Sequence, residues 1–343
     1  MPVTRDLPAL ALLAPDDGTL AGAFMAADRL VVSTGLLVLL GGAGYLAVAG
    51  LPTPAWRLTR RLERRAWWLL RVAWWATLVG TLAGLLLYGP FTAGLPLSRM
   101  LDATLLHQTL RTRFGAAWAV RVLLLLLLAL LRVWSERQAA GMRTSAWVAV
   151  GGLAAALVVT PALSGHAAAG PDAAVGAVIG VVHFSAAAVW LGGLVLLGTC
   201  VLAHADAGLP QAVPRFSTVA FTAMVVIVVT GILQGWRQVG SLQALGQTGY
   251  GRLLVAKVAV FLVLIVVAGR SRVLVRRKLM ARASVGAAAP DRDRGDAARP
   301  HLGEIDGGSL WLLRRLVLTE VIIAIVVLAV TALLGIATPP RPA

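Results

Sequence analysis

The sequence is poor in charged residues and nearly free of cysteine. Charged residues make up 13% of the 343 positions, about half the share found in an average soluble domain. The one cysteine, Cys200, excludes an intrachain disulfide and a zinc site built on several cysteines. No glycine-rich loop ending in Gly-Lys-Ser or Gly-Lys-Thr is present. The chain is therefore not expected to hydrolyse ATP, and no enzymatic activity is predicted.

Apolar residues dominate the composition of the sequence. They form 59% of the sequence, and the mean hydropathy is +0.83. Several runs approach or exceed the ~20 apolar residues that cross a bilayer as a helix, and long continuous runs select helices over barrel strands. The sequence therefore predicts an all-α polytopic membrane helical bundle, a single transmembrane domain over residues 1–343. About eight transmembrane helices are expected, near residues 28–50, 66–88, 115–134, 145–163, 173–202, 216–236, 252–271 and 314–336.

The basic residues are distributed unevenly between the two sides of this bundle. The net charge is +16, but the arginines cluster in short loops beside the spans, which is a topological signal and not a nucleic-acid footprint. Twenty Lys and Arg fall on one side and eight, including Arg29, on the other. The richer side is expected to be cytoplasmic, which places both termini outward. On the cytoplasmic side, residues 283–309 combine mixed charge with Gly and Pro and predict a flexible linker.

Three of the five histidines are expected in the outer half of the membrane or above it. His107 precedes the third span, His166 lies in a loop, and His183 lies inside the apolar run VVHFSAAAVWLGGL. An ionisable residue inside a span is a functional candidate, and imidazole is a common ligand of copper, zinc, nickel and iron. The alternative for His183 is a neutral histidine hydrogen-bonded to a neighbouring helix. The alternatives for His107 and His166 are a surface amphipathic helix and a solvated loop.

A few other residues of the spans suggest specific contacts. Arg121 and Lys257 are expected near the outer ends of their helices, where they can reach the interface or bind anionic groups. Glu320 is expected to pair with a basic residue near the inner end of the last span. Glycines in the first span favour the close approach of another helix; these are Gly41, Gly42 and Gly44.

Six stretches follow one another in a characteristic order. They are TRFGAAWAVRVLLLLLL, SGHAAAG, HFSAAAVWLGGL, VPRFSTVAFTAMVVIVVTGI, QTGYGRLLVAKVAVFLVLIVVAGRSR and LRRLVLTEVIIAIVVLAVTALLGIATPP. Together they resemble the copper-resistance protein D (CopD) family, from about residue 100 to the end. The first two spans resemble that family only in hydropathy.

The resemblance implies an all-helical protein of the inner (plasma) membrane that acts in copper transport or copper tolerance. It implies that His166 and His183 belong to family motifs, and that a periplasmic copper-binding protein is a partner beside the membrane lipid. On this interpretation His107 and His166 capture a copper ion, Cu(I) or Cu(II), and His183 accepts it within the bundle.

Two alternative functions stay open. One is a haem-binding electron-transfer protein, because the family is thought to be distantly related to membrane di-haem cytochromes. The other is a partner that delivers copper to another membrane protein. Nucleic acid is not an expected partner.

Overall fold

The protein is built from helices throughout the residues that its structure describes. The structure is a computed structural model and describes residues 20–49, 60–137, 144–165, 172–201, 209–287 and 307–340. No strand occurs in these ranges, which confirms the all-α prediction. The α-helices are α1 (Leu20–Ala49), α2 (Arg60–Ala93), α3 (Ala103–Arg111), α4 (Arg113–Glu136), α5 (Thr144–Ser164), α6 (Ala173–Ala187), α7 (Gly193–Leu196), α8 (Leu209–Val239), α9 (Leu242–Gln247), α10 (Gly249–Ala287) and α11 (Gly307–Ile336). A 3₁₀ turn, η2 (Leu97–Arg99), precedes α3, and two π-helical segments, η4 (Ala188–Gly192) and η5 (Leu197–Val201), flank α7.

Eight segments of the described chain are long and apolar enough to cross a membrane, which confirms the predicted number. The first of them begins earlier than predicted, at Leu20 instead of residue 28. Asp28 and Arg29 therefore lie inside a span, although the sequence placed Arg29 among the outward loop residues. The eight segments are Leu20–Leu46, Glu63–Ala93, Arg113–Ser135, Ser145–Ser164, Ala173–Thr199, Phe216–Val239, Gly249–Val273 and Arg314–Ile336.

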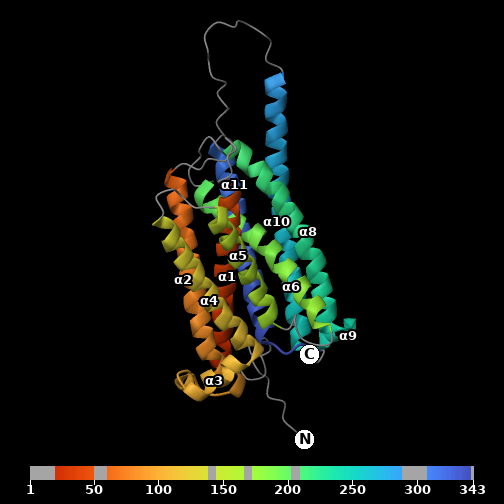
Figure 1. Ribbon diagram of the computed structural model, residues 1–343. Coiled ribbons are helices and arrows are strands. Elements are labelled where there is room, and N and C mark those ends of the chain that lie inside the picture. Colours follow the sequence, from red (N-terminus) through yellow and green to blue (C-terminus); the bar gives the residue numbers. More distant parts are fainter. Residues whose placement is uncertain are drawn as a thin grey trace.

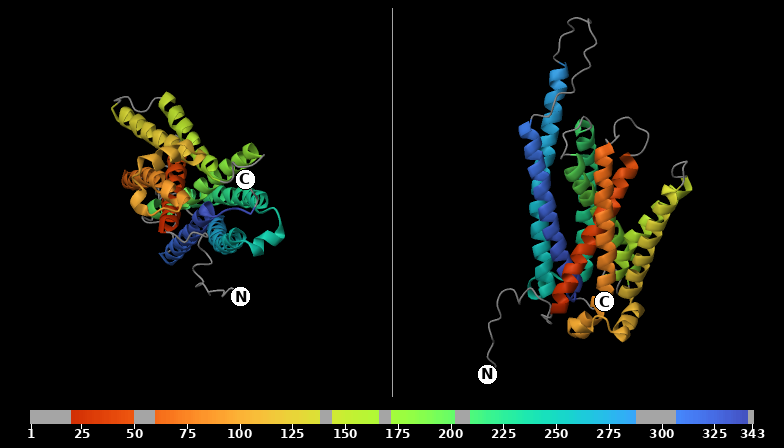
Figure 2. Two further views of the ribbon diagram at one scale, coloured as in Figure 1. Left: turned by 90° about the horizontal axis from the view of Figure 1, so that it is seen from below. Right: turned by 90° about the vertical axis from the view of Figure 1, so that its left-hand side faces the viewer.

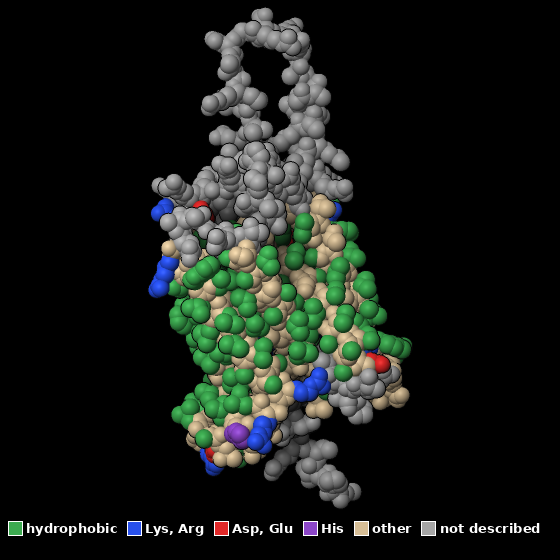
Figure 3. All heavy atoms as spheres, viewed as in Figure 1, with side chains coloured by type: hydrophobic (Ala, Val, Ile, Leu, Met, Phe, Trp, Pro, Cys, Tyr) green, Lys and Arg blue, Asp and Glu red, His purple; other side chains and the backbone are tan. Residues whose placement is uncertain are grey.

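Helix α1 packs against α2, η4 and α11 and so lies within the bundle. Helices α4 and α5 pair at one edge, and α10 and α11 pair at another (Figure 1 and Figure 2). The start of α1 and the end of α11 lie at the same end of the bundle, as an even number of spans requires (Figure 1). Figure 3 shows hydrophobic side chains over the flank and basic side chains toward the two ends. This apolar belt is the surface that a multi-pass membrane protein presents to lipid.

Helix α10 is longer than a bilayer is thick. Its 39 residues extend about 58 Å at 1.5 Å per residue, whereas its apolar span covers only Gly249–Val273. The remainder projects at the end of the bundle opposite α3 (Figure 1). Because α10 continues to Ala287 and α11 begins at Gly307, both ends of the expected linker 283–309 are helical. Its middle part, 288–306, lies outside the described residues.

Helix α1 and segment η4 cross with their main chains in contact. A Cβ atom on Gly41 would lie 1.8 Å from the carbonyl oxygen of Ala188, and one on Gly192 would lie 2.4 Å from the carbonyl oxygen of Leu37. Neither position therefore has room for a side chain. The close approach predicted from the glycines of the first span is confirmed at Gly41, whereas a Cβ on Gly44 would meet nothing within 4 Å among the described residues.

Candidate functional site

His183 lies in the membrane-spanning part of α6, ten residues after the first residue of the helix, or about 15 Å along its axis. The other polar side chain of α6, Ser185, donates to the carbonyl of Val181 at 2.7 Å within the same helix. The imidazole is thus the polar side chain of α6 that forms a hydrogen bond with another helix. Its Nδ1 lies 2.8 Å from Oγ1 of Thr230 on α8.

Thr230 determines which imidazole nitrogen carries the proton. The Thr230 hydroxyl has a single proton and donates it to the carbonyl of Val226 at 2.5 Å. Its oxygen then accepts from its other partner, so Nδ1 of His183 is the N–H donor. Nε2 carries the lone pair and is the nitrogen able to bind a metal. Metal-binding histidines are commonly oriented by this kind of bond from the second ring nitrogen.

Helices α8 and α10 bring two further residues to the imidazole. A Cβ atom on Gly231 would lie 3.6 Å from Cε1 of His183, so the ring packs directly on α8. Lys257 of α10 is close enough for its charge to act on His183. An ammonium group at Lys257 opposes a cation at Nε2, whereas a neutral amine does not. The protonation of Lys257 therefore bears on any metal at His183.

The other predicted ligands lie apart from His183 or outside the described residues. His107 is exposed on α3, which packs against α2 and α4. His166 falls outside the described residues. Over the ranges that the structure describes, no group of three or more His, Cys, Asp or Glu side chains is placed to hold a metal ion. His183 is also the one described histidine inside a candidate span, so these ranges do not supply a bis-histidine haem site.

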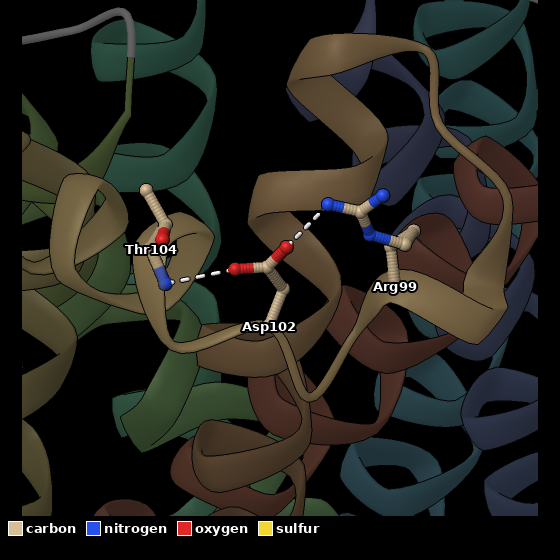
Figure 4. Close-up of polar contacts among 3 residues, drawn as sticks. All are labelled: Arg99, Asp102 and Thr104. Carbon is tan, nitrogen blue, oxygen red and sulfur yellow. Dashed lines mark hydrogen bonds and ion pairs between the residues drawn. The ribbon is translucent and has the colours of Figure 1, made fainter.

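Asp102 begins α3, the surface helix that carries His107. Its carboxylate accepts from Nη2 of Arg99 at 2.5 Å and from the amide of Thr104 at 2.8 Å (Figure 4). The Thr104 bond caps the helix, and the Arg99 bond is an exposed ion pair, which adds little by itself. The Arg99 bond first, and then the Thr104 bond, lower the pKa of Asp102 below its ordinary value of 3.8. The cap is therefore complete above pH 3.8 and is lost as the pH falls through the lowered value.

Replacing Asp102 by alanine is expected to loosen α3 and leave the spans folded, because the substitution removes the capping oxygen. Trypsin cleavage after Arg111, measured in proteoliposomes at pH 7, should be faster in the alanine variant than in the wild type. Asp102→Asn keeps a side-chain oxygen that can cap and should be cleaved at close to the wild-type rate. Equal rates for all three proteins would show that the cap does not hold α3.

A second set of polar side chains lies inside the bundle, toward the end at which α1 begins and α11 ends. Asp28 and Arg29 of α1 are close enough to Arg121 of α4 to act on it electrostatically. Arg121 is 2% exposed, so the expectation that it reaches the interface is wrong. It stays inside because its Nε donates to Oγ1 of Thr160 at 2.9 Å and its guanidinium lies 4.8 Å from the centre of the Trp118 ring.

Glu320 is buried on α11 and accepts from the hydroxyl of Ser271 on α10 at 2.5 Å. The basic partner expected from the sequence is not found, since no ion pair to Glu320 occurs within the described residues. A serine hydroxyl takes the place of that partner.

Two family models match consecutive parts of the chain. Residues 19–177 match the copper resistance protein D-like N-terminal domain, and residues 210–334 match copper resistance protein D. The chain belongs to the copper resistance protein D (CopD) family. The match to the N-terminal domain model begins at residue 19 and so includes the first two spans, which by sequence alone resembled the family only in hydropathy.

A curated relative of this CopD-family chain is the copper transport protein CutJ of Bacillus subtilis (strain 168), 31% identical over 178 residues. The match covers 50% of this chain and 33% of CutJ, so it extends over about one third of the length of that relative. No solved structure matches the chain. Family membership and the eight apolar segments together make it a copper-related, multi-pass membrane protein of the CopD family.

Proposed function

We propose that this protein moves copper across the inner membrane and binds it within the bundle through His183. Membership of the CopD family and the likeness to a copper transport protein support copper as the cargo. The observation that carries the proposal is the bond from Nδ1 of His183 to Thr230, because it leaves Nε2 with its lone pair inside an apolar span. A histidine that serves packing alone could make the same bond, and the experiment below separates the two roles.

The proposed route begins at the outward face. A periplasmic copper-binding protein is the proposed donor, and His107 and His166 are the proposed residues of first capture. His183 then accepts the ion within the bundle. Neutral imidazole suits Cu(I), and imidazole combined with oxygen ligands suits Cu(II). Because the sequence has no nucleotide-binding loop, an ion gradient, the membrane potential or proton movement would drive transport, and no enzymatic step is proposed.

Replacing His183 by glutamine tests the proposal. Glutamine keeps an amide that can bond to Thr230 but offers no imidazole nitrogen to a metal. Copper binding by the purified variant is expected to lose the intramembrane site. Copper uptake into liposomes of defined orientation should fall at least about tenfold, in line with the loss of a ligand worth about 1.4 kcal/mol or more.

Two controls make the result decisive. The variant must elute as the wild type does on size exclusion, which establishes folding. The absorption spectrum of the wild type should contain no Soret band, because such a band would favour the haem-binding alternative. Unchanged copper stoichiometry and affinity in a folded His183→Gln protein would leave His183 as a neutral histidine that joins α6 to α8, and the copper role would fail.

A further inference from the structure

The polar residues around Arg121 come from several helices. Three contacts join them: two between a guanidinium and an aromatic ring, and one between two rings. The guanidinium of Arg29 lies 5.3 Å from the centre of the Phe114 ring, and that ring lies 4.4 Å from the ring of Trp118. The Trp118 ring is in turn 4.8 Å from the guanidinium of Arg121. Phe114 and Trp118 thus join the two arginines into one continuous cluster.

Asp28 belongs to the same cluster. A Cβ atom on Gly84 would lie 2.0 Å from Cζ3 of Trp118 and 2.5 Å from Oδ2 of Asp28. The carboxylate and the indole therefore meet at one point on α2. The cluster lies toward the end of the bundle at which α11 ends, which the basic residues of the loops predict to face outward, because a Cβ on Gly335, one residue before the end of α11, would lie 2.7 Å from Nη1 of Arg29.

Charge is unbalanced in this cluster. Two guanidinium groups face one carboxylate, and no N···O contact of 4.0 Å or less joins Asp28 to either arginine within the described residues. Arg29 also acts on Arg121 as a like charge. Charged groups inside a membrane protein are costly unless they are paired, and those that persist mark functional sites.

The cluster also has more unpaired hydrogen-bond donors than acceptors. Four buried atoms of the cluster have no hydrogen-bond partner among the residues that the structure describes: Nε of Arg29, Nε1 of Trp118, Nη1 of Arg121 and Oδ2 of Asp28. Three of the four are N–H donors, and only one is an acceptor. Trp118 and Arg121 are 3% and 2% exposed. Donors left unpaired at such depth are unfavourable, and a ligand that supplies acceptors and one negative charge would satisfy them.

We propose that Arg29, Trp118 and Arg121 form a binding site for a small monovalent inorganic anion such as chloride, entered from the outer side of the membrane. The anion accepts from unpaired N–H groups of this cluster and neutralises the excess positive charge. Asp28 opposes the anion and keeps its affinity moderate. This site is separate from His183, and its test requires no copper.

The test uses the purified full-length protein in nanodiscs, with chloride as the probe and gluconate at equal ionic strength as the reference. Chloride is expected to raise the wild-type Tm by several degrees in a saturable manner, because a ligand that binds only the folded state stabilises it. Arg121→Gln should abolish the chloride-dependent shift. Asp28→Asn should do the opposite and lower the chloride concentration at half-effect several-fold, since it removes the opposing charge.

Iodide quenching of tryptophan fluorescence provides a measurement that does not require Arg121→Gln to fold. Iodide is expected to quench a saturable part of the emission, chloride should compete with it, and Trp118→Phe should remove that part. The proposal is overturned if chloride and gluconate give the same wild-type Tm and chloride does not compete with iodide. It is equally overturned if a chloride effect exists but is unchanged in Asp28→Asn and Trp118→Phe, because the anion would then bind elsewhere.

Discussion

Replacing Gly41 by leucine is expected to prevent α1 from packing against η4. The first added carbon alone would lie 1.8 Å from the carbonyl oxygen of Ala188 and 2.9 Å from Cα of Gly192. Both are main-chain atoms and cannot rotate away as a flexible side chain can, so the two helices must separate. Overpacking typically costs about 1–3 kcal/mol, and this substitution belongs at or above the upper end of that range.

Gly44 provides the matched control for this substitution, three residues further along α1. A Cβ atom there would meet no described atom within 4 Å, so Gly44→Leu adds the same atoms without a clash against the part of the chain that the structure describes. Thermal denaturation and size exclusion in detergent should show a large loss of folded protein for Gly41→Leu and near-wild-type behaviour for Gly44→Leu. A monodisperse Gly41→Leu protein with the wild-type Tm would mean that the α1–η4 contact is looser than described.

Replacing Thr230 by valine is expected to weaken copper binding about 10- to 100-fold, the usual effect of losing the group that orients a metal-binding histidine. Valine has nearly the shape of threonine but no oxygen to accept from Nδ1 of His183, which lies 2.8 Å from Oγ1 in the wild type. The imidazole is then free to change tautomer and to turn, so that Nε2 no longer presents its lone pair in one direction.

Thr230→Ser keeps the hydroxyl and should retain most of the copper affinity. Titration of purified protein with copper, with a competing chelator, measures all three proteins on one scale. If valine and serine bind copper as tightly as threonine does, the hydrogen bond does not orient a ligand. His183 would then bind copper without help from α8, or would not bind it.

The hydropathy of the sequence predicted the eight spans well but concealed the buried charges of the first one. Asp28 and Arg29 interrupt the apolar run, so the predicted span began only at residue 28, whereas the helix begins at Leu20. These residues are inside because other helices surround them with Phe114, Trp118 and Gly335. That arrangement depends on segments far apart in the chain and leaves no local signal.

The sequence predicted only part of the candidate site, because the partner of His183 lies far away in the chain. An imidazole within an apolar run identified His183, but its partner Thr230 is 47 residues away and one threonine among several in α8. Their meeting depends on how α6 and α8 pack. The π-helical turns of η4 and η5 also gave no signal, because an extra residue in a helical turn leaves the hydropathy of the segment unchanged. The part played by His107 and His166 in copper capture stays a prediction.

The charge of Lys257, which acts on His183, has a consequence for the valence of a cation bound there. Coulomb repulsion grows in proportion to the charge of the arriving cation. A divalent copper ion at Nε2 would meet twice the opposition from the Lys257 ammonium that a monovalent ion meets at the same place. A protonated Lys257 would therefore disfavour Cu(II), and other divalent ions that bind imidazole, more strongly than Cu(I) at His183.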